Sequence, residues 1–231
     1  KVNYALEKGY IHEILSLEKA AAISNLVVVS APANVSLKLI HQLLDAAGDH
    51  TVVMDFCSTT QAICQSIVNH RHRSRYVAAH PMAGSEKAGP QNAVTNLFFG
   101  KRIAICESER SSDIALKAAR KLIEELHMFP SFLTAEQHDQ IMAEVSHLPQ
   151  VAAFCLANTT GDSNHALGWA GSGFESTTRL AGSDVAIWTP ILLQNSVNVT
   201  KGIRRLIENL EATLVALETS NANALKTIIL N

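Results

Sequence analysis

Three short runs of uninterrupted apolar residues constrain the fold of this chain more than any other feature. They occupy residues 26–29, 52–54 and 76–79, and stretches with the length and composition of helices separate them. A strand that is apolar at every position, rather than at alternate positions, is covered on both faces, which is typical of a parallel sheet between layers of helices. The chain is therefore predicted to begin with alternating strands and helices around a doubly wound sheet.

The order of the expected elements divides the chain into two parts. Asn34 and Ser112 are the expected N-caps of helices over 35–47 and 112–128, and a third helix is expected over 60–69. Further short strands are expected at 101–106 and 131–133. From residue 135 onward strands are no longer indicated: residues 137–158 form one long helical pattern, bent near Pro149, and residues 203–217 carry an apolar stripe at helical spacing. We place an α/β domain at residues 1–134 and an all-helical domain at 135–231.

The composition argues against several classes of protein. The 231 residues are 47% apolar and carry 19 basic and 21 acidic side chains. Basic residues cluster only in the short run 71–75, so neither a nucleic-acid partner nor a basic membrane surface is expected. The apolar runs are shorter than the roughly 18 residues of a membrane span, and the cysteines show no Cys-x-x-Cys spacing. These features predict a soluble protein of the reducing cytoplasm.

A polar segment after the strand at 76–79 holds the first candidate for chemistry. It begins at His80 and continues through Ser85, Glu86 and Lys87. Ligands of open α/β sheets bind beyond the carboxyl ends of the strands, so His80, expected at the first position after its strand, is well placed to meet a substrate. A structural histidine in a turn explains the same residue equally well.

Three motifs in order resemble the prephenate/arogenate dehydrogenase (TyrA) family. They are residues 80–89 (His-Pro-Met-Ala-Gly-Ser-Glu-Lys-Ala-Gly), residues 145–149 (Val-Ser-His-Leu-Pro) and residues 171–184, which begin Gly-Ser-Gly-Phe and end Ala-Gly-Ser-Asp. The resemblance extends over nearly the whole chain. It implies a Rossmann-like, doubly wound parallel sheet that binds NAD or NADP, followed by a helical dimerisation domain through which two copies form a homodimer.

The reaction that the resemblance implies is NAD(P)-dependent oxidative decarboxylation of prephenate to 4-hydroxyphenylpyruvate in tyrosine biosynthesis, with arogenate as the alternative substrate. By the same resemblance, His80 takes a hydrogen bond from the substrate hydroxyl, Ser58 orients that histidine, and Arg179 binds a carboxylate. Without the resemblance, Ser58 is an ordinary N-cap for the helix at 60–69 and Arg179 is a surface residue.

Further residues are implied around the substrate and the cofactor. Ser85 and Glu86 match positions at the pocket entrance, and Trp188 matches an aromatic residue beside the substrate, although a core tryptophan is as good an interpretation. His147 is favoured as a buried imidazole bonded to a neighbouring loop, and with Gln150 it completes the substrate-binding candidates. No metal ligand is expected. The candidate cofactor contacts are Ser30, Ala31, Pro32 and Ser58.

Two departures from the family pattern leave questions open. Gln150 stands where many members have a second histidine, so the choice between prephenate and arogenate is open. The chain also has no Gly-x-Gly-x-x-Gly turn for a pyrophosphate. We expect the first βαβ unit, with that turn, to precede Lys1 outside this sequence, because the apolar strand at 26–31 would otherwise form a bare sheet edge. A regulatory relative without a cofactor site is the alternative.

Two other enzyme classes share some of these sequence features. A metal-dependent hydrolase is suggested by His80, His138, Asp139 and His147, but His138 and His147 are nine residues apart and do not share a helix face. A related hydroxyacid dehydrogenase of the same two-part architecture would be expected to use a lysine on its helical part. No lysine occurs between residues 124 and 191.

Overall fold

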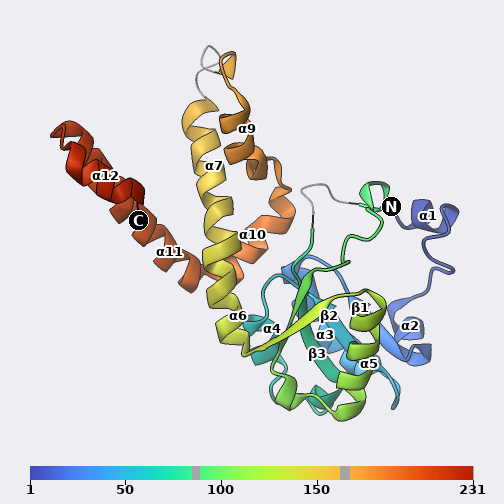
Figure 1. Cartoon of the computed structure of the whole chain (residues 1–231). Coiled ribbons are helices and arrows are strands. Elements are labelled where there is room, and N and C mark those ends of the chain that lie inside the picture. Colours follow the sequence, from blue (N-terminus) through green and yellow to red (C-terminus); the bar gives the residue numbers. More distant parts are fainter. Residues whose placement is uncertain (85–88, 162–166, 231) are drawn as a thin grey trace.

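The computed structural model describes residues 1–84, 89–161 and 167–230, so Ser85 and Glu86 lie outside the described residues. The first part of the chain is built on a five-stranded sheet in the order β1-β2-β3-β4-β5. The sheet lies at the lower right in Figure 1. The strands are β1 (Leu26–Val29), β2 (Val52–Phe56), β3 (Tyr76–Pro81), β4 (Arg102–Cys106) and β5 (Phe129–Leu133).

The sheet is mixed in direction. Strands β1, β2 and β3 run parallel to one another, β4 runs antiparallel to β3, and β5 runs parallel to β4. The predicted α/β class and Rossmann-like sheet are confirmed, but the sheet is not wholly parallel as expected. An apolar run indicates that both faces of a strand are buried and carries no information about its direction.

Helices cover both faces of the sheet, as the apolar strands predicted. One apolar cluster joins a first face to α2 (Leu17–Ile23), α3 (Ala33–Ala46) and α4 (Gln61–Ser66). A second cluster joins the opposite face to α5 (Asp113–Glu125). Successive strand residues alternate between the two clusters, since side chains of a strand point to opposite faces. Smaller elements are α1 (Val2–Glu7) and 3₁₀ turns at Arg73–Arg75, Pro90–Asn92 and Ser108–Arg110.

The structure shows whether Ser112 and Asn34 cap their helices as predicted. The Ser112 hydroxyl accepts a hydrogen bond from the Ala115 amide and caps α5, as predicted. Asn34 is not the cap of α3, which begins at Ala33, two residues earlier than predicted, with Pro32 at the N-cap. The ring of Pro32 holds its φ at −53°, close to the helical value, so the helix begins directly after it and places Asn34 in the first turn.

The second part of the chain is helical throughout its described residues. Thr134 and Gln137 form a capping box, after which α6 (Ala135–Met142), a π-helical turn (Ala143–His147) and α7 (Leu148–Gly161) form one long rod (Figure 1). The predicted irregularity near Pro149 is this π turn, which lies just before the proline. The remaining helices are α9 (Ser172–Thr178), a 3₁₀ turn (Arg179–Gly182), α10 (Val185–Gln194), α11 (Ser196–Glu218) and α12 (Ala222–Leu230).

Polar contacts join the helical part to the loop after β2. The Asp139 carboxylate on α6 accepts hydrogen bonds from the main-chain amides of Thr60 (2.9 Å) and Gln61 (3.1 Å), at the start of α4. The Thr59 hydroxyl donates to Gln194 at the end of α10 over 2.6 Å. Through these contacts the helical part lies against the carboxyl end of β2.

None of the helices in the described part of the chain has the length and apolar character needed to cross a membrane.

Candidate active site

His80 lies inside β3 rather than beyond it. The strand extends through Pro81, and His80 pairs with Ala104 of β4. Its Nδ1 is 2.9 Å from Nε2 of His138, and the two rings meet edge to face. Burial, and then the neighbouring His138 and His147 rings, lower the pKa of His80 to about 3. The imidazole is therefore neutral at pH 7, and its nitrogen without a hydrogen can accept a hydrogen bond.

Two buried residues of α6 stand behind His80. His138 and Asp139 are 0% and 1% exposed, and His138 Nδ1 is 2.7 Å from Asp139 Oδ1. Burial raises the pKa of Asp139, but hydrogen bonds from His138, Thr60 and Gln61 outweigh it, and the pKa lies below its usual value. The sequence had suggested this pair only as metal ligands. In the described part of the chain, no group of three His, Cys, Asp or Glu residues is placed to hold a metal.

A cavity of about 390 Å³ brings together four of the expected substrate residues. Ser58 and Gly84 line it from the loops that follow β2 and β3, and the helical part contributes Gln150, Arg179 and Trp188. His80 is not one of the lining residues. It lies in β3, four residues before Gly84, with its imidazole against the helical part. Serine and histidine thus approach from the sheet, and arginine and tryptophan from the helices.

The residues of this cavity differ in burial and in the contacts they make. Gln150 is 1% exposed and donates its amide to the Leu180 carbonyl over 2.6 Å, which holds the turn that begins at Arg179. Trp188 is half-buried on α10 and packs edge to face against the His147 ring, with centroids 6.0 Å apart. Arg179 is exposed at the mouth. A fixed amide, an aromatic wall and a cation therefore face one space.

His147 is a buried imidazole with one partner in the described chain. The Asn195 amide group, which also donates to the Asp139 carbonyl, lies 3.1 Å from His147 Nδ1. Since Asn195 Nδ2 is a donor, His147 Nδ1 accepts and the proton lies on Nε2, which is buried without a partner. Burial lowers the pKa of His147 to about 4. Asn195 connects α10 to α11, so the expected link to a neighbouring segment is present.

The expected cofactor residues lie at the end of β1. Ser30 and Pro32 are exposed and Ala31 is partly buried, with its carbonyl accepting from the Ser36 hydroxyl over 3.0 Å. These three residues follow β1 as Ser58 follows β2, so all four lie at the same edge of the sheet. None of the three lines the cavity described above.

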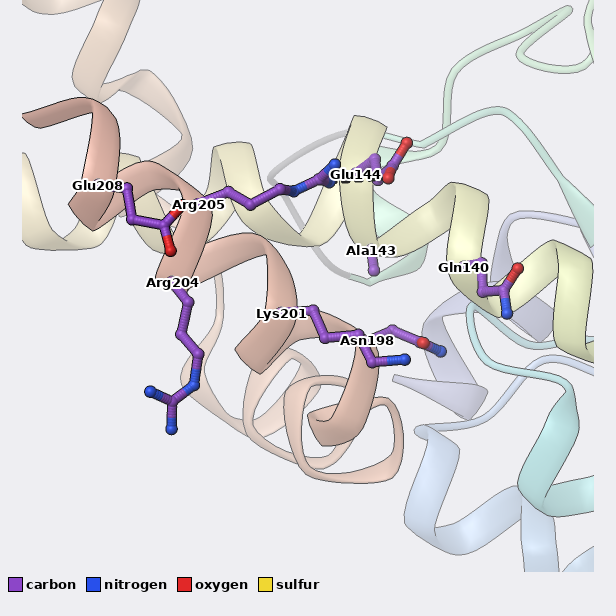
Figure 2. Close-up of a pocket in the computed structure, with 8 residues that line it drawn as sticks. All are labelled: Gln140, Ala143, Glu144, Asn198, Lys201, Arg204, Arg205 and Glu208. Atoms are coloured by element: carbon purple, nitrogen blue, oxygen red, sulfur yellow. Dashed lines mark hydrogen bonds and ion pairs between the residues drawn. The ribbon is translucent and has the colours of Figure 1, made fainter.

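A larger hollow of about 470 Å³ lies between α6 and α11 (Figure 2). Its side chains are mostly charged and exposed, and Arg205 pairs with Glu144 over 2.8 Å. Figure 2 shows that Arg204 points away from the other labelled side chains instead of converging with them. None of the expected site residues lies here, so the cavity between the two parts is the candidate active site.

The fold and the cavity define a class: a Rossmann-like domain and a helical domain that enclose a substrate-sized space at the carboxyl ends of parallel strands, as in two-domain dehydrogenases. Two family models match the chain. One is the nucleotide-binding domain of prephenate dehydrogenase, over residues 2–128, and the other is the dimerization domain of prephenate dehydrogenase, over residues 134–230. The chain belongs to the prephenate dehydrogenase family.

Individual relatives agree with this assignment. The chain is 27% identical to a prephenate dehydrogenase of Lactococcus lactis, over 97% of this chain and 63% of the relative, and 24% identical to one of Bacillus subtilis, over 86% and 55%. It therefore spans less than two thirds of the length of these relatives. A prephenate dehydrogenase of Aquifex aeolicus, in complex with hydroxyphenyl propionate and NAD+, superposes with a TM-score of 0.87 at 26% identity, covering 98% of this chain and 81% of that one.

Proposed function

We propose that the protein is an NAD(P)-dependent dehydrogenase that converts prephenate to 4-hydroxyphenylpyruvate by oxidative decarboxylation, in tyrosine biosynthesis. The observation that carries the proposal is the cavity between the two parts, which Ser58, Arg179 and Trp188 line, together with a neutral His80 in β3, four residues before the lining residue Gly84. The two matching family models and the named relatives support the same reaction.

Each residue of this site has a role in the proposed reaction. Arg179 binds a substrate carboxylate, because a planar guanidinium donates two hydrogen bonds to one carboxylate group. Trp188 packs against the ring of the substrate. Neutral His80 takes the hydroxyl proton as the hydroxyl becomes a carbonyl, and Ser58 contacts the substrate beside it. Loss of carbon dioxide then makes the ring aromatic, and the resulting phenolate takes up a proton.

The cofactor site is proposed at the carboxyl ends of β1 and β2, where Ser30, Ala31, Pro32 and Ser58 offer main-chain groups and hydroxyls. A bound nicotinamide would accept the hydride from the carbinol carbon. The buried Nε2–H of His147, which lacks a partner beside Trp188, fits a polar group of a ligand in the adjacent cavity. The chain has no Gly-x-Gly-x-x-Gly turn, so no residue is proposed for the pyrophosphate.

Arogenate is the second candidate substrate, and the neutral side chain of Gln150 is the reason to propose it. Its side chain is neutral and already donates to the Leu180 carbonyl, so it offers no charge that would select a keto acid over an amino acid. Ser85 and Glu86, proposed at the entrance by resemblance, belong to the segment outside the described residues. The ratio of kcat/KM for the two substrates decides between them.

We also propose residues 1–134 as the cofactor domain and 135–231 as the substrate and dimerisation domain. Two copies would associate through the helical part, in keeping with the description of the matching dimerization domain. A cytoplasmic location is proposed from the cysteines. All four are free, and burial raises the pKa of the Cys57, Cys64 and Cys106 thiols, so these are unreactive apolar side chains that suit a reducing compartment.

The proposal is tested by the appearance of NAD(P)H absorbance when the full-length protein is given prephenate or arogenate. We expect His80→Asn to lower kcat by about 10²- to 10⁴-fold with little change in KM, because it removes the proton acceptor. Arg179→Gln should raise KM by about 10- to 100-fold. His12→Asn and Arg204→Gln, both exposed and neither among the residues that line the cavity, are the matched controls. A wild type inactive on both substrates would contradict the proposed function.

A further inference from the structure

The hydrogen bonds behind His80 form a chain that ends on a carboxylate. His80 Nδ1 contacts His138 Nε2 at 2.9 Å, and His138 Nδ1 contacts Asp139 Oδ1 at 2.7 Å. His138 and Asp139 are almost completely buried, so water does not compete for these contacts. The described partner of His80 Nδ1 is thus a histidine of the helical part, and not the serine that the family resemblance suggested.

The Asp139 carboxylate at the end of this series of hydrogen bonds can only accept, which fixes the direction of the bond from His138. Asp139 accepts from the Thr60 and Gln61 amides as well as from His138, which keeps it an acceptor. His138 Nδ1 therefore carries a proton. With His138 neutral, as the proposal below requires, its second nitrogen Nε2 has no hydrogen and accepts, so His80 Nδ1 is the donor. The second nitrogen of His80, Nε2, is then left without a proton.

We propose that His138, held by Asp139, is a positioning residue that fixes His80 in the Nδ1–H tautomer and so makes Nε2 the proton acceptor of the reaction. The inference deepens the proposed function and rests on it for the identity of the proton donor, the substrate hydroxyl. In serine hydrolases, a carboxylate likewise holds the catalytic histidine in one tautomer through the ring nitrogen that faces away from the substrate. Loss of that tautomer lowers kcat strongly. Here a second imidazole lies between carboxylate and base.

In this arrangement the tautomer of His80 also depends on the contact between the α/β part and the helical part of the chain. His80 belongs to β3, whereas His138 and Asp139 belong to α6. The Asp139 carboxylate that orders His138 also caps α4. The ionisable groups that act on His80 are His138, His147 and Asp139, all contributed by the helical part. The tautomer is therefore set only where the helical part is docked on the sheet.

The test compares His138→Leu with His138→Gln in the full-length protein. Leucine removes the acceptor for His80 Nδ1–H, and we expect kcat to fall by about 10²-fold while KM changes less than about 2-fold. Glutamine can place its amide oxygen near the position of Nε2 and accept the same bond, so it should recover most of the lost kcat. A loss that is only structural would not be recovered in this way. Thermal unfolding of both variants identifies any that fail to fold.

Nitrogen NMR of histidine-labelled protein gives a readout that does not need activity. We expect the wild-type spectrum to show His80 protonated at Nδ1 and unprotonated at Nε2, and His138→Leu to lose this preference. Protonation of His80 at Nε2, or donation from a doubly protonated His138, would overturn the inference, as would wild-type kcat in His138→Leu. If the wild type turns over neither substrate, the proposed function fails, whereas the tautomer is still measured.

Discussion

Asp55 lies fully buried in β2 and has an ionisable group that the proposed reaction does not use. Its Oδ1 accepts from the Ala79 amide over 3.1 Å, while its Oδ2 has no hydrogen-bond partner in the described chain. Burial raises the pKa of Asp55 from 3.8 to about 6, although hydrogen bonds from Cys57 and Ala79 oppose the shift. A carboxyl that resists ionisation in the folded state makes folding depend on pH.

The sign of that dependence follows from proton binding. Between pH 3.8 and about 6 the folded protein holds the Asp55 proton and the unfolded chain releases it, so this residue lowers the free energy of unfolding as pH rises, by about 3 kcal/mol in total. Asp55→Asn removes the ionisation but keeps an acceptor for Ala79. We expect the stability of the variant relative to wild type to increase by most of that amount between pH 4 and pH 7.5, measured by urea unfolding. An equal difference at both pH values would contradict this account.

The candidate site could be predicted in part at the level of single residues. His80 and Arg179 were predicted from motifs, and Ser58 and Trp188 from the family resemblance. The structure places Ser58, Arg179 and Trp188 on one cavity. The link from His80 to His138 could not be predicted, because 58 residues separate them and their contact depends on how the two parts pack. The only signal in the sequence was the adjacent His138-Asp139 pair, which equally suggested a metal.

At the scale of elements, the five strands and the helices α3, α4 and α5 were predicted within a few residues, since apolar runs and caps are local signals, whereas α9, α10 and α12 were not predicted. The short strand β1 ends at Val29 and β3 continues through His80, two boundaries that the sequence placed differently. A bend near Pro149 was predicted, but neither its π-helical form nor the direction of β4 was. The direction of β4 depends on pairing between distant segments and has no local sequence signature.

The packing of α11 against the rod formed by α6, the π turn and α7 can be tested by substitutions at one position. Gly202 is buried on α11, and a Cβ atom there would lie 3.4 Å from a methyl group of Leu148, at the start of α7. Gly202→Ala should raise the free energy of unfolding by up to about 1 kcal/mol, because alanine favours the helix and the methyl group can shift slightly. Gly202→Leu should lower it by about 1–3 kcal/mol, because the larger side chain separates the helices.

Chemical denaturation of the two variants beside wild type measures this difference. Both substitutions are made at one position of one helix. Their higher helix propensity than glycine raises stability in each case, whereas crowding against Leu148 lowers stability only for leucine. If Gly202→Leu were as stable as Gly202→Ala, α11 would not be packed against Leu148 as the structure has it. Activity is a secondary readout, because Gly202 is not among the proposed substrate or cofactor residues.

At the scale of the whole molecule, α11 and α12 extend away from the sheet (Figure 1). Their exposed side chains include large apolar ones: Leu210 is 59% exposed, Leu214 54% and Leu217 58%. These three residues recur at helical spacing and form an apolar stripe facing outward. Contiguous exposed apolar surface of this kind marks an interaction site, and a second copy of the chain is the partner we propose for it.

The proposed homodimer is tested by light scattering after size-exclusion chromatography. We expect the wild-type protein to elute as a dimer at micromolar concentration, and Leu210→Glu together with Leu214→Glu to elute as a monomer, because two carboxylates per copy would be buried without partners in the interface. Ile114→Glu, an equally drastic change at a position 73% exposed on α5, is the matched control and should remain dimeric. A monomeric wild type, or a dimer that survives both substitutions, would show that this stripe is not where two copies meet.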